Sequence, residues 1–330
     1  MLLPRLPLGA KSKKQTNSFM RRGFKINSDL SENQIEADVA SYLGSCSPFW
    51  KKRFRIISVD EQLTGADKIF NKFVPLYLQF KKSLGLKSLN KKLQKSNLRT
   101  PLQKIREFRF TNSLSGSPIL YFKLRDKAKT AKDFQHNILL SKHKPPSQFA
   151  FYVAPLTLSN LEYENKFQAE WWRSFIYADP FVYGDINISD GANSYFFHGI
   201  PFLRTHVSIP PHQKVTNSDH YYSYSKNGGD IVWHSGEKLS EDFRFSSQIN
   251  NIYNSIILNP EETGLSQEVF SNEIDEFYTI NEIDSNIRNL SFNEKVREYS
   301  SYLLKNFEIK LFMMGVTNNS APNNSSTPLS

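Results

Sequence analysis

Residues 29–154 alternate between helix-like and strand-like segments, and this order leaves few folds open. Residues 29–43 carry one apolar stripe at helical spacing, made of Ile35, Val39, Tyr42 and Leu43. The patterns that follow predict strands over 53–59, 74–80, 119–124 and 149–154, and helices over 102–110 and 131–140. The order helix–strand–strand–helix–strand–helix–strand predicts an α/β fold with a mixed sheet flanked by helices.

The rest of the chain has a different pattern. Short segments over 202–207 and 231–234 predict strands between Pro, Gly, Asn and Ser, and residues 261–312 predict helices. Residues 1–28 read as a basic flexible arm, and residues 317–330 have the composition of a disordered tail. We therefore expect an α/β domain over 29–156 and an accessory α+β domain, β-rich and helical, over 157–316.

Charge is divided unevenly along the chain. Residues 1–150 contain 30 Lys and Arg against 10 Asp and Glu, whereas residues 151–330 contain 12 against 22. Such a basic half favours a polyanionic partner, most simply nucleic acid, because phosphates that bind Lys and Arg release their counterions. The alternatives are a solvated basic face without a partner, or a basic half that docks on the acidic half or on an acidic protein.

The remaining bulk properties limit the class of protein. The single cysteine, Cys46, excludes an intrachain disulfide and a four-cysteine zinc site, and this fits a reducing, cytoplasmic location. No apolar run approaches the ~18 residues of a membrane-spanning helix, so we expect no membrane association through such a helix. The histidines of the second half have no regular ligand spacing, and we expect them to be hydrogen-bonded side chains instead of zinc ligands.

The stretch from residue 61 to residue 81 contains the candidate catalytic and metal-binding residues. It contains two carboxylates, Glu61 and Asp67, and then Gln79 and Lys81. If the strands over 53–61 and 74–81 pair as a hairpin, Gln79 and Lys81 share one face and Phe80 turns to the other. Oxygen atoms of this kind hold a hard divalent cation, and a nearby lysine can orient or activate a water molecule. This set of side chains is what metal-dependent phosphodiester cleavage requires.

Glu61-Gln62-Leu63-Thr64-Gly65-Ala66-Asp67 followed by Leu78-Gln79-Phe80-Lys81 resembles the PD-(D/E)xK nuclease superfamily, in the variant E-x-x-x-G-A-D … Q-x-K. The resemblance covers roughly residues 29–156. It implies a restriction-endonuclease-like core of helix–strand–strand–strand–helix–strand, dependence on Mg²⁺ (or Mn²⁺), and cleavage of DNA. By family analogy alone, it also implies a role in defence against foreign DNA.

The resemblance assigns roles to individual residues. Asp67 matches the motif aspartate, a metal ligand, and Lys81 matches the catalytic lysine. Glu61 matches the acid before Gly-Ala-Asp, and Glu36 is the candidate for the helix glutamate, with Glu32 on the same helix side. Gln79 stands where the family usually has an acid, and a neutral amide holds Mg²⁺ more weakly than a carboxylate. The alternative is therefore a catalytically inactive nucleic-acid-binding protein with the same fold.

Two kinds of partner follow from these expectations. DNA would contact basic residues that flank the site, namely Lys51, Lys52, Arg53, Lys82, Lys87, Lys91 and Lys92. Residues 157–316 carry no recognised motif, and they leave room for a protein partner or for a second copy of the chain.

Overall fold

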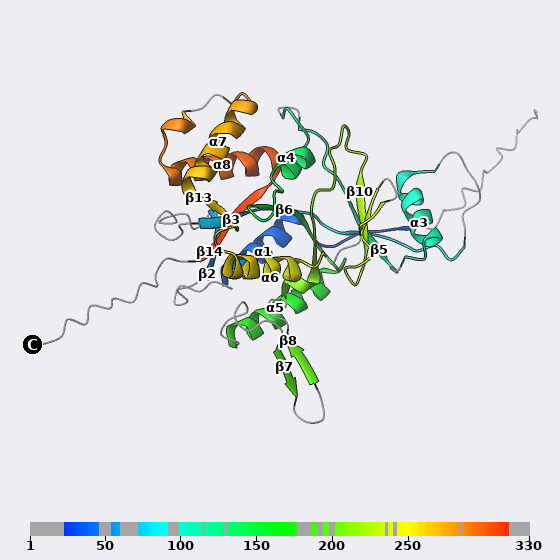
Figure 1. Cartoon of the computed structure of the whole chain (residues 1–330). Helices are drawn as coiled ribbons and strands as arrows, with labels where there is room; N and C mark the ends of the chain where they lie inside the picture. The colour runs from blue at the N-terminus through cyan, green and yellow to red at the C-terminus, as the bar shows by residue number, and fades with distance from the viewer. Residues whose placement is uncertain are drawn as a thin grey trace, which may run out of the picture.

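The chain has an α/β fold with two six-stranded sheets and one two-stranded sheet (Figure 1). The computed structural model describes residues 23–45, 54–59, 72–91, 99–114, 116–128, 131–176, 186–189, 194–197, 202–234, 237–239, 243–283 and 286–316. Within these ranges, none of the helices has the length and apolar character that a bilayer crossing requires.

The central sheet is mixed. Its strands run in the order β2 (Phe54–Ser58), β14 (Lys310–Val316), β3 (Lys72–Phe80), β6 (Phe149–Pro155) and β9 (His206–Ile209). Strands β3 and β6 are parallel, and the other neighbours are antiparallel. The short β13 (Leu265–Ser266) pairs with the start of β3. Strands β13 and β6 both pair with the same edge of β3, and Pro75 lies between these two ladders of hydrogen bonds. Proline has no N–H donor, and at this position it interrupts neither ladder.

Strands β2 and β3 are not neighbours, so the hairpin predicted from the sequence is wrong. β14 lies between them, with Met313 opposite Ile57 on one side and opposite Pro75 on the other. Met313 is buried in the core on one face of the sheet, and Met314 is buried in the core on the opposite face. A strand that is apolar on both faces is stable where both faces are covered, which places it in the interior of a sheet.

The C-terminal part of the chain contains helices and a final strand. The sequence predicts helices over 261–312, and the structure has α7 (Gln267–Ile280), the 3₁₀ turn η3 (Ile287–Asn289) and α8 (Phe292–Phe307) there. Glu308 ends α8 in the left-handed conformation, with φ of 52°. The helical prediction is wrong for residues 310–312, because the chain turns at Glu308 and enters β14.

The second sheet is antiparallel throughout. Its strands run in the order β1 (Lys25–Ile26), β4 (Leu84–Leu86), β5 (Ile119–Lys123), β10 (Tyr221–Ser225), β11 (Val232–Trp233) and β12 (Glu237–Lys238). Helix α3 (Pro101–Thr111) packs Leu102 and Ile105 against this sheet. A capping box formed by Thr100 and Gln103 fixes the start of α3.

Helices cover both faces of the central sheet (Figure 1). On one face lie α1 (Glu32–Ser45) and α6 (Phe245–Leu258), and the predicted apolar stripe of α1 is buried against β3. On the other face lie α4 (Gln135–Ser141), α7, α8 and the second sheet. Helix α5 (Asn160–Ile176) contacts the 3₁₀ turn η2 (Phe202–Thr205), and a separate hairpin joins β7 (Ile186–Ser189) to β8 (Ser194–Phe197).

Both six-stranded sheets combine strands from the two sides of residue 156. Strands β9 and β14 complete the central sheet, while β10, β11 and β12 complete the second. The boundary that the sequence predicts between residues 156 and 157 therefore does not fall between two sheets.

Candidate functional site

Gln79 and Lys81 lie at the end of β3, and both are buried, with 0% and 5% of their surface exposed. Residues of β3 alternate between the two cores, because Tyr77 belongs to the core with α7 and α8 whereas Phe80 belongs to the core with α1. The predicted orientation of Phe80 is therefore confirmed. The backbone N–H of Lys81 donates to the Val153 carbonyl at 2.9 Å, which extends the pairing with β6 by one residue.

The Gln79 side chain is a buried amide without a hydrogen-bond partner among the described residues. Neither Oε1 nor Nε2 is satisfied. Leaving a buried polar group unsatisfied costs roughly 1–3 kcal/mol of folding free energy. Native proteins retain few buried polar groups without a hydrogen bond, so each one requires an explanation. One such explanation is that the group binds a ligand. The amide oxygen of Gln79 thus has an unused acceptor position among the described residues.

Lys81 places a positive charge where few water molecules reach it. Burial lowers the pKa of Lys81, and the attraction of Glu32 and Glu308 opposes this effect, while Arg125 adds to it. A lysine with a lowered pKa gives up its proton more readily than an exposed one, so it can take part in proton transfer. Lys81 is thus a stronger candidate for a catalytic role than an exposed lysine would be at the same position.

Two glutamates of α1 reach the same end of the central sheet. Glu32 accepts a hydrogen bond from the backbone N–H of Lys82 at 3.3 Å. Glu36 lies one turn further along α1 and contacts the ammonium of Lys310 at 3.3 Å. The carboxylates of α1 thus lie near the end of β3, as predicted: Glu32 contacts the residue after Lys81, and Glu36 contacts the first residue of β14.

Some predicted site residues cannot be placed. Glu61, Asp67, Lys51, Lys52, Arg53 and Lys92 lie outside the described residues. Of the predicted DNA contacts that are described, Lys82, Lys87 and Lys91 are exposed. Lys82 directly follows Lys81, so a polyanion held by these exposed ammonium groups would pass close to the end of β3.

The described part of the site fits a hard divalent cation only in part. Glu36 offers a carboxylate on the α1 face of the central sheet, and Gln79 offers an unsatisfied amide oxygen on the opposite face, which it shares with Tyr77; both are ligand types for Mg²⁺ or Mn²⁺. Among the described residues, no group of three or more His, Cys, Asp and Glu side chains is arranged to hold a metal ion. A complete metal site would therefore need the predicted ligands Glu61 and Asp67 in addition.

Among the described histidines of the second half, His206 and His212 are held by hydrogen bonds, as the sequence predicts, whereas His220 Nδ1 and His234 Nε2 have no hydrogen-bond partner among the described residues. His136 contacts the Tyr152 hydroxyl at 2.9 Å and the Gln213 carbonyl at 2.8 Å, and burial lowers the pKa of His136 to about 4. His206 is enclosed next to the Tyr163 hydroxyl at 3.3 Å. His136 is thus a neutral structural side chain at physiological pH.

Lys310 is the site residue that sequence reasoning missed. It is buried at the start of β14 and forms the ion pair with Glu36 described above. The available signal was a lysine that opens the apolar run Leu311-Phe312-Met313-Met314. The sequence pattern predicts that this run is the end of a helix, and a helix would not place Lys310 beside β3.

Comparison with known proteins finds no relatives. No protein-family model, no curated protein and no solved structure matches the chain significantly.

Proposed function

We propose that this chain is a metal-dependent DNA endonuclease with a restriction-endonuclease-like fold. The observation that carries the proposal is the end of β3, where the unsatisfied amide of Gln79 lies two residues before the buried Lys81, and where Glu32 of α1 attracts Lys81 and accepts a hydrogen bond from the backbone of Lys82. Cleavage of a phosphodiester needs oxygen ligands for a cation and a positive group at the phosphate. The residue types at this position supply both.

Lys81 is the residue that we assign to the reacting phosphate. Its lowered pKa makes the neutral amine more abundant near pH 7 than in an exposed lysine, so the amine can accept a proton from water. In its protonated form the same group would stabilise negative charge on the phosphate. Glu61 and Asp67, together with Glu36 or with Gln79, would hold a divalent cation, which would polarise the phosphate.

Charge supports DNA as the partner. The exposed ammonium groups of Lys82, Lys87 and Lys91 follow β3 along the chain. They belong to the half of the sequence that has 30 basic against 10 acidic residues. Such a surface attracts the phosphates of DNA, with an affinity that falls steeply as the salt concentration rises.

One contact favours a second candidate function, a DNA-binding protein that has lost catalysis. Lys310 pairs with Glu36, so a cation would have to compete with this ammonium for the carboxylate. Together with the neutral Gln79, this pair would weaken metal binding. The second candidate predicts salt-sensitive DNA binding that EDTA does not change, and no turnover.

Plasmid cleavage tests the first candidate. We expect the purified protein to nick or linearise supercoiled plasmid with Mg²⁺ or Mn²⁺, to stop when EDTA is added, and to lose activity on Asp67→Asn substitution. Plasmid that stays intact with both metals, although the protein binds it, would establish the second candidate. Equal cleavage by wild type and Asp67→Asn would refute the assigned site.

Gln79→Leu separates stability from function. Leucine removes the unsatisfied amide from its buried position, so we expect the free energy of unfolding to rise by roughly 1–2 kcal/mol. Cleavage should fall at the same time, because the amide oxygen is lost as a ligand. Urea denaturation and plasmid cleavage measure the two effects. A Leu variant that is less stable, yet cuts normally, would show that the amide has only a structural role.

A further inference from the structure

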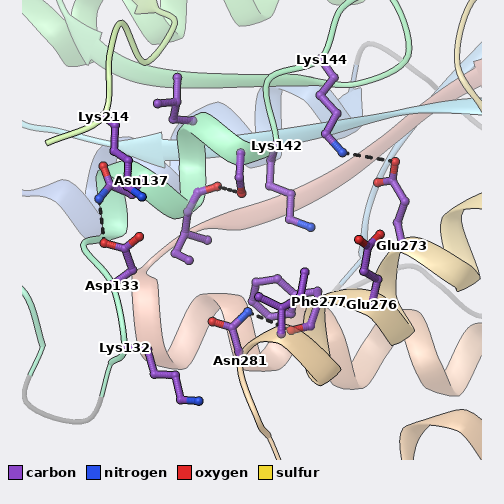
Figure 2. A pocket seen from close by; sticks show the side chains of 14 residues that line it. Lys132, Asp133, Asn137, Lys142, Lys144, Lys214, Glu273, Glu276, Phe277 and Asn281 are labelled. Carbon is purple, nitrogen blue, oxygen red and sulfur yellow. Dashed lines mark hydrogen bonds and ion pairs between the residues drawn. The ribbon is translucent and has the colours of Figure 1, made fainter.

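A concave site lies on the α4–α7 side of the molecule, apart from the end of β3. The cavity has a volume of about 570 Å³ and lies between α4 with the chain that follows it and α7 (Figure 2). This volume is within the ~300–1,000 Å³ typical of small-molecule sites. Neither Gln79 nor Lys81 lines it. An inference about this cavity is therefore independent of the proposed nuclease function.

Lys142 is the distinctive residue of the cavity. Only 7% of its surface is exposed, and its ammonium points into the cavity in Figure 2. The ammonium nitrogen lies over the rings of Phe277 at 4.7 Å and Tyr299 at 5.3 Å, measured to the ring centroids. It forms neither a hydrogen bond nor an ion pair with the described residues. Buried ammonium groups are normally paired, so this cation lacks the anion that its burial calls for.

The acids near Lys142 do not supply that anion. Glu273 accepts a hydrogen bond from Gln148 Nε2 at 3.1 Å and lies 3.7 Å from the ammonium of Lys144. At the other end of the cavity, Asp133 accepts from the Asn137 amide at 2.7 Å. Glu273 and, more weakly, Glu276 attract Lys142, but neither forms an ion pair with its ammonium. The carboxylates that line the cavity are thus engaged elsewhere or held at a distance.

The remaining lining offers an apolar surface. Ile138 of α4 and Phe277 and Ile280 of α7 face the same cavity as Lys142. Small-molecule sites combine an apolar lining with a few polar groups that fix the orientation of the ligand. A ligand with one oxyanion and one apolar body matches both features.

We infer that this cavity binds a small organic anion, with its carboxylate or phosphate group paired to the Lys142 ammonium and its apolar body against Ile138, Phe277 and Ile280. The oxyanion restores the missing partner of the buried cation, and a charge-assisted hydrogen bond of this kind is stronger than a neutral one. The aromatic rings beneath the ammonium hold it in place for that contact.

Calorimetric titration of the full chain tests the inference with three defined molecules. Phenyl phosphate and benzoate carry an oxyanion on an apolar ring, whereas benzyl alcohol carries the ring without the charge. We expect saturable binding of at least one of the two anions and none of benzyl alcohol. Preference for phenyl phosphate over benzoate, or the reverse, identifies which oxyanion the site takes. Absence of binding by both anions would overturn the inference.

Variants locate the binding. Lys142→Met keeps the length of the side chain and removes its charge, so we expect affinity for the anion to fall by about tenfold or more. Lys132→Met is the matched control, because Lys132 lines the same cavity but is already paired with Glu282 at 2.6 Å. Glu276→Gln removes a nearby negative charge, and we expect affinity to rise severalfold. Unchanged affinity in both Lys142→Met and Glu276→Gln would place the ligand elsewhere.

The wild-type pH dependence provides a check that needs no variant. Burial lowers the pKa of Lys142 to about 8, with Glu273 and Glu276 raising it and Lys144 lowering it. Burial raises the pKa of the neighbouring Tyr77 and Tyr299, so these hydroxyls stay neutral up to pH 10. A bound anion favours the protonated amine, so affinity should be constant below pH 8 and should fall above it. Affinity that stays level from pH 7 to pH 10 would contradict the role of Lys142.

Discussion

Truncation of the chain before β14 is expected to abolish folding of the whole protein. β14 pairs with β2 on one side and with β3 on the other, and its side chains enter both cores. Its removal leaves β2 without its only partner among the described strands, leaves β3 unpaired on one side, and opens both cores to water. The expected loss exceeds the roughly 5–15 kcal/mol that stabilises a typical domain. Circular dichroism and thermal denaturation of a chain that ends at residue 308 measure the effect.

Two further chains sharpen this test. A chain that ends at Val316 keeps β14, and we expect it to unfold cooperatively like the full chain. In the full chain, Met313→Asp places an unpaired carboxylate in the core and should destabilise the protein by about 4 kcal/mol. Cooperative folding of a fragment containing only residues 1–156 would contradict the structure and would restore the predicted domain boundary.

Lys81→Met is expected to reduce DNA cleavage by about 10²–10⁴-fold, the usual contribution of a group that transfers protons in the reaction. DNA binding should change little, because exposed lysines supply most of the attraction to phosphates. Cleavage rates on plasmid and fluorescence anisotropy with a labelled duplex separate the two effects. The matched control is Lys82→Met, which removes the exposed neighbouring charge and leaves the buried one in place.

The same variant has a stability signature with a definite sign. Burial lowers the pKa of Lys81 in the folded state, so folding of wild type is disfavoured most where the amine is protonated, below that pKa. The penalty declines as the pH rises from the folded-state pKa toward the ordinary value for lysine. Lys81→Met should therefore be more stable than wild type at neutral pH, with a difference that shrinks at high pH.

Equal cleavage by Lys81→Met and wild type would refute the catalytic assignment.

Local patterns in the sequence predict much of the fold. The apolar stripe of residues 29–43 forms α1, and the apolar runs at 53–59, 74–80, 119–124 and 149–154 fall on β2, β3, β5 and β6. The alternation around Phe80 is also local, and it orients the side chains of β3 correctly. A segment that buries one face has apolar residues at about every 3.6 positions in a helix or at every second position in a strand. These features can therefore be predicted from the segment alone, without the strands or helices that it packs against.

The sequence by itself thus determined the α/β class, the elements from α1 to β6 apart from β4, and the position of Gln79 and Lys81 two residues apart at the end of one strand. Only the tertiary structure decided that β14 separates β2 from β3, that Lys310 meets Glu36, and that the Lys142 ammonium is buried over aromatic rings without an anionic partner among the described residues. The physical reason is sequence separation. Any apolar strand can pair with any other, and the choice depends on how all the buried faces of the chain are covered at once.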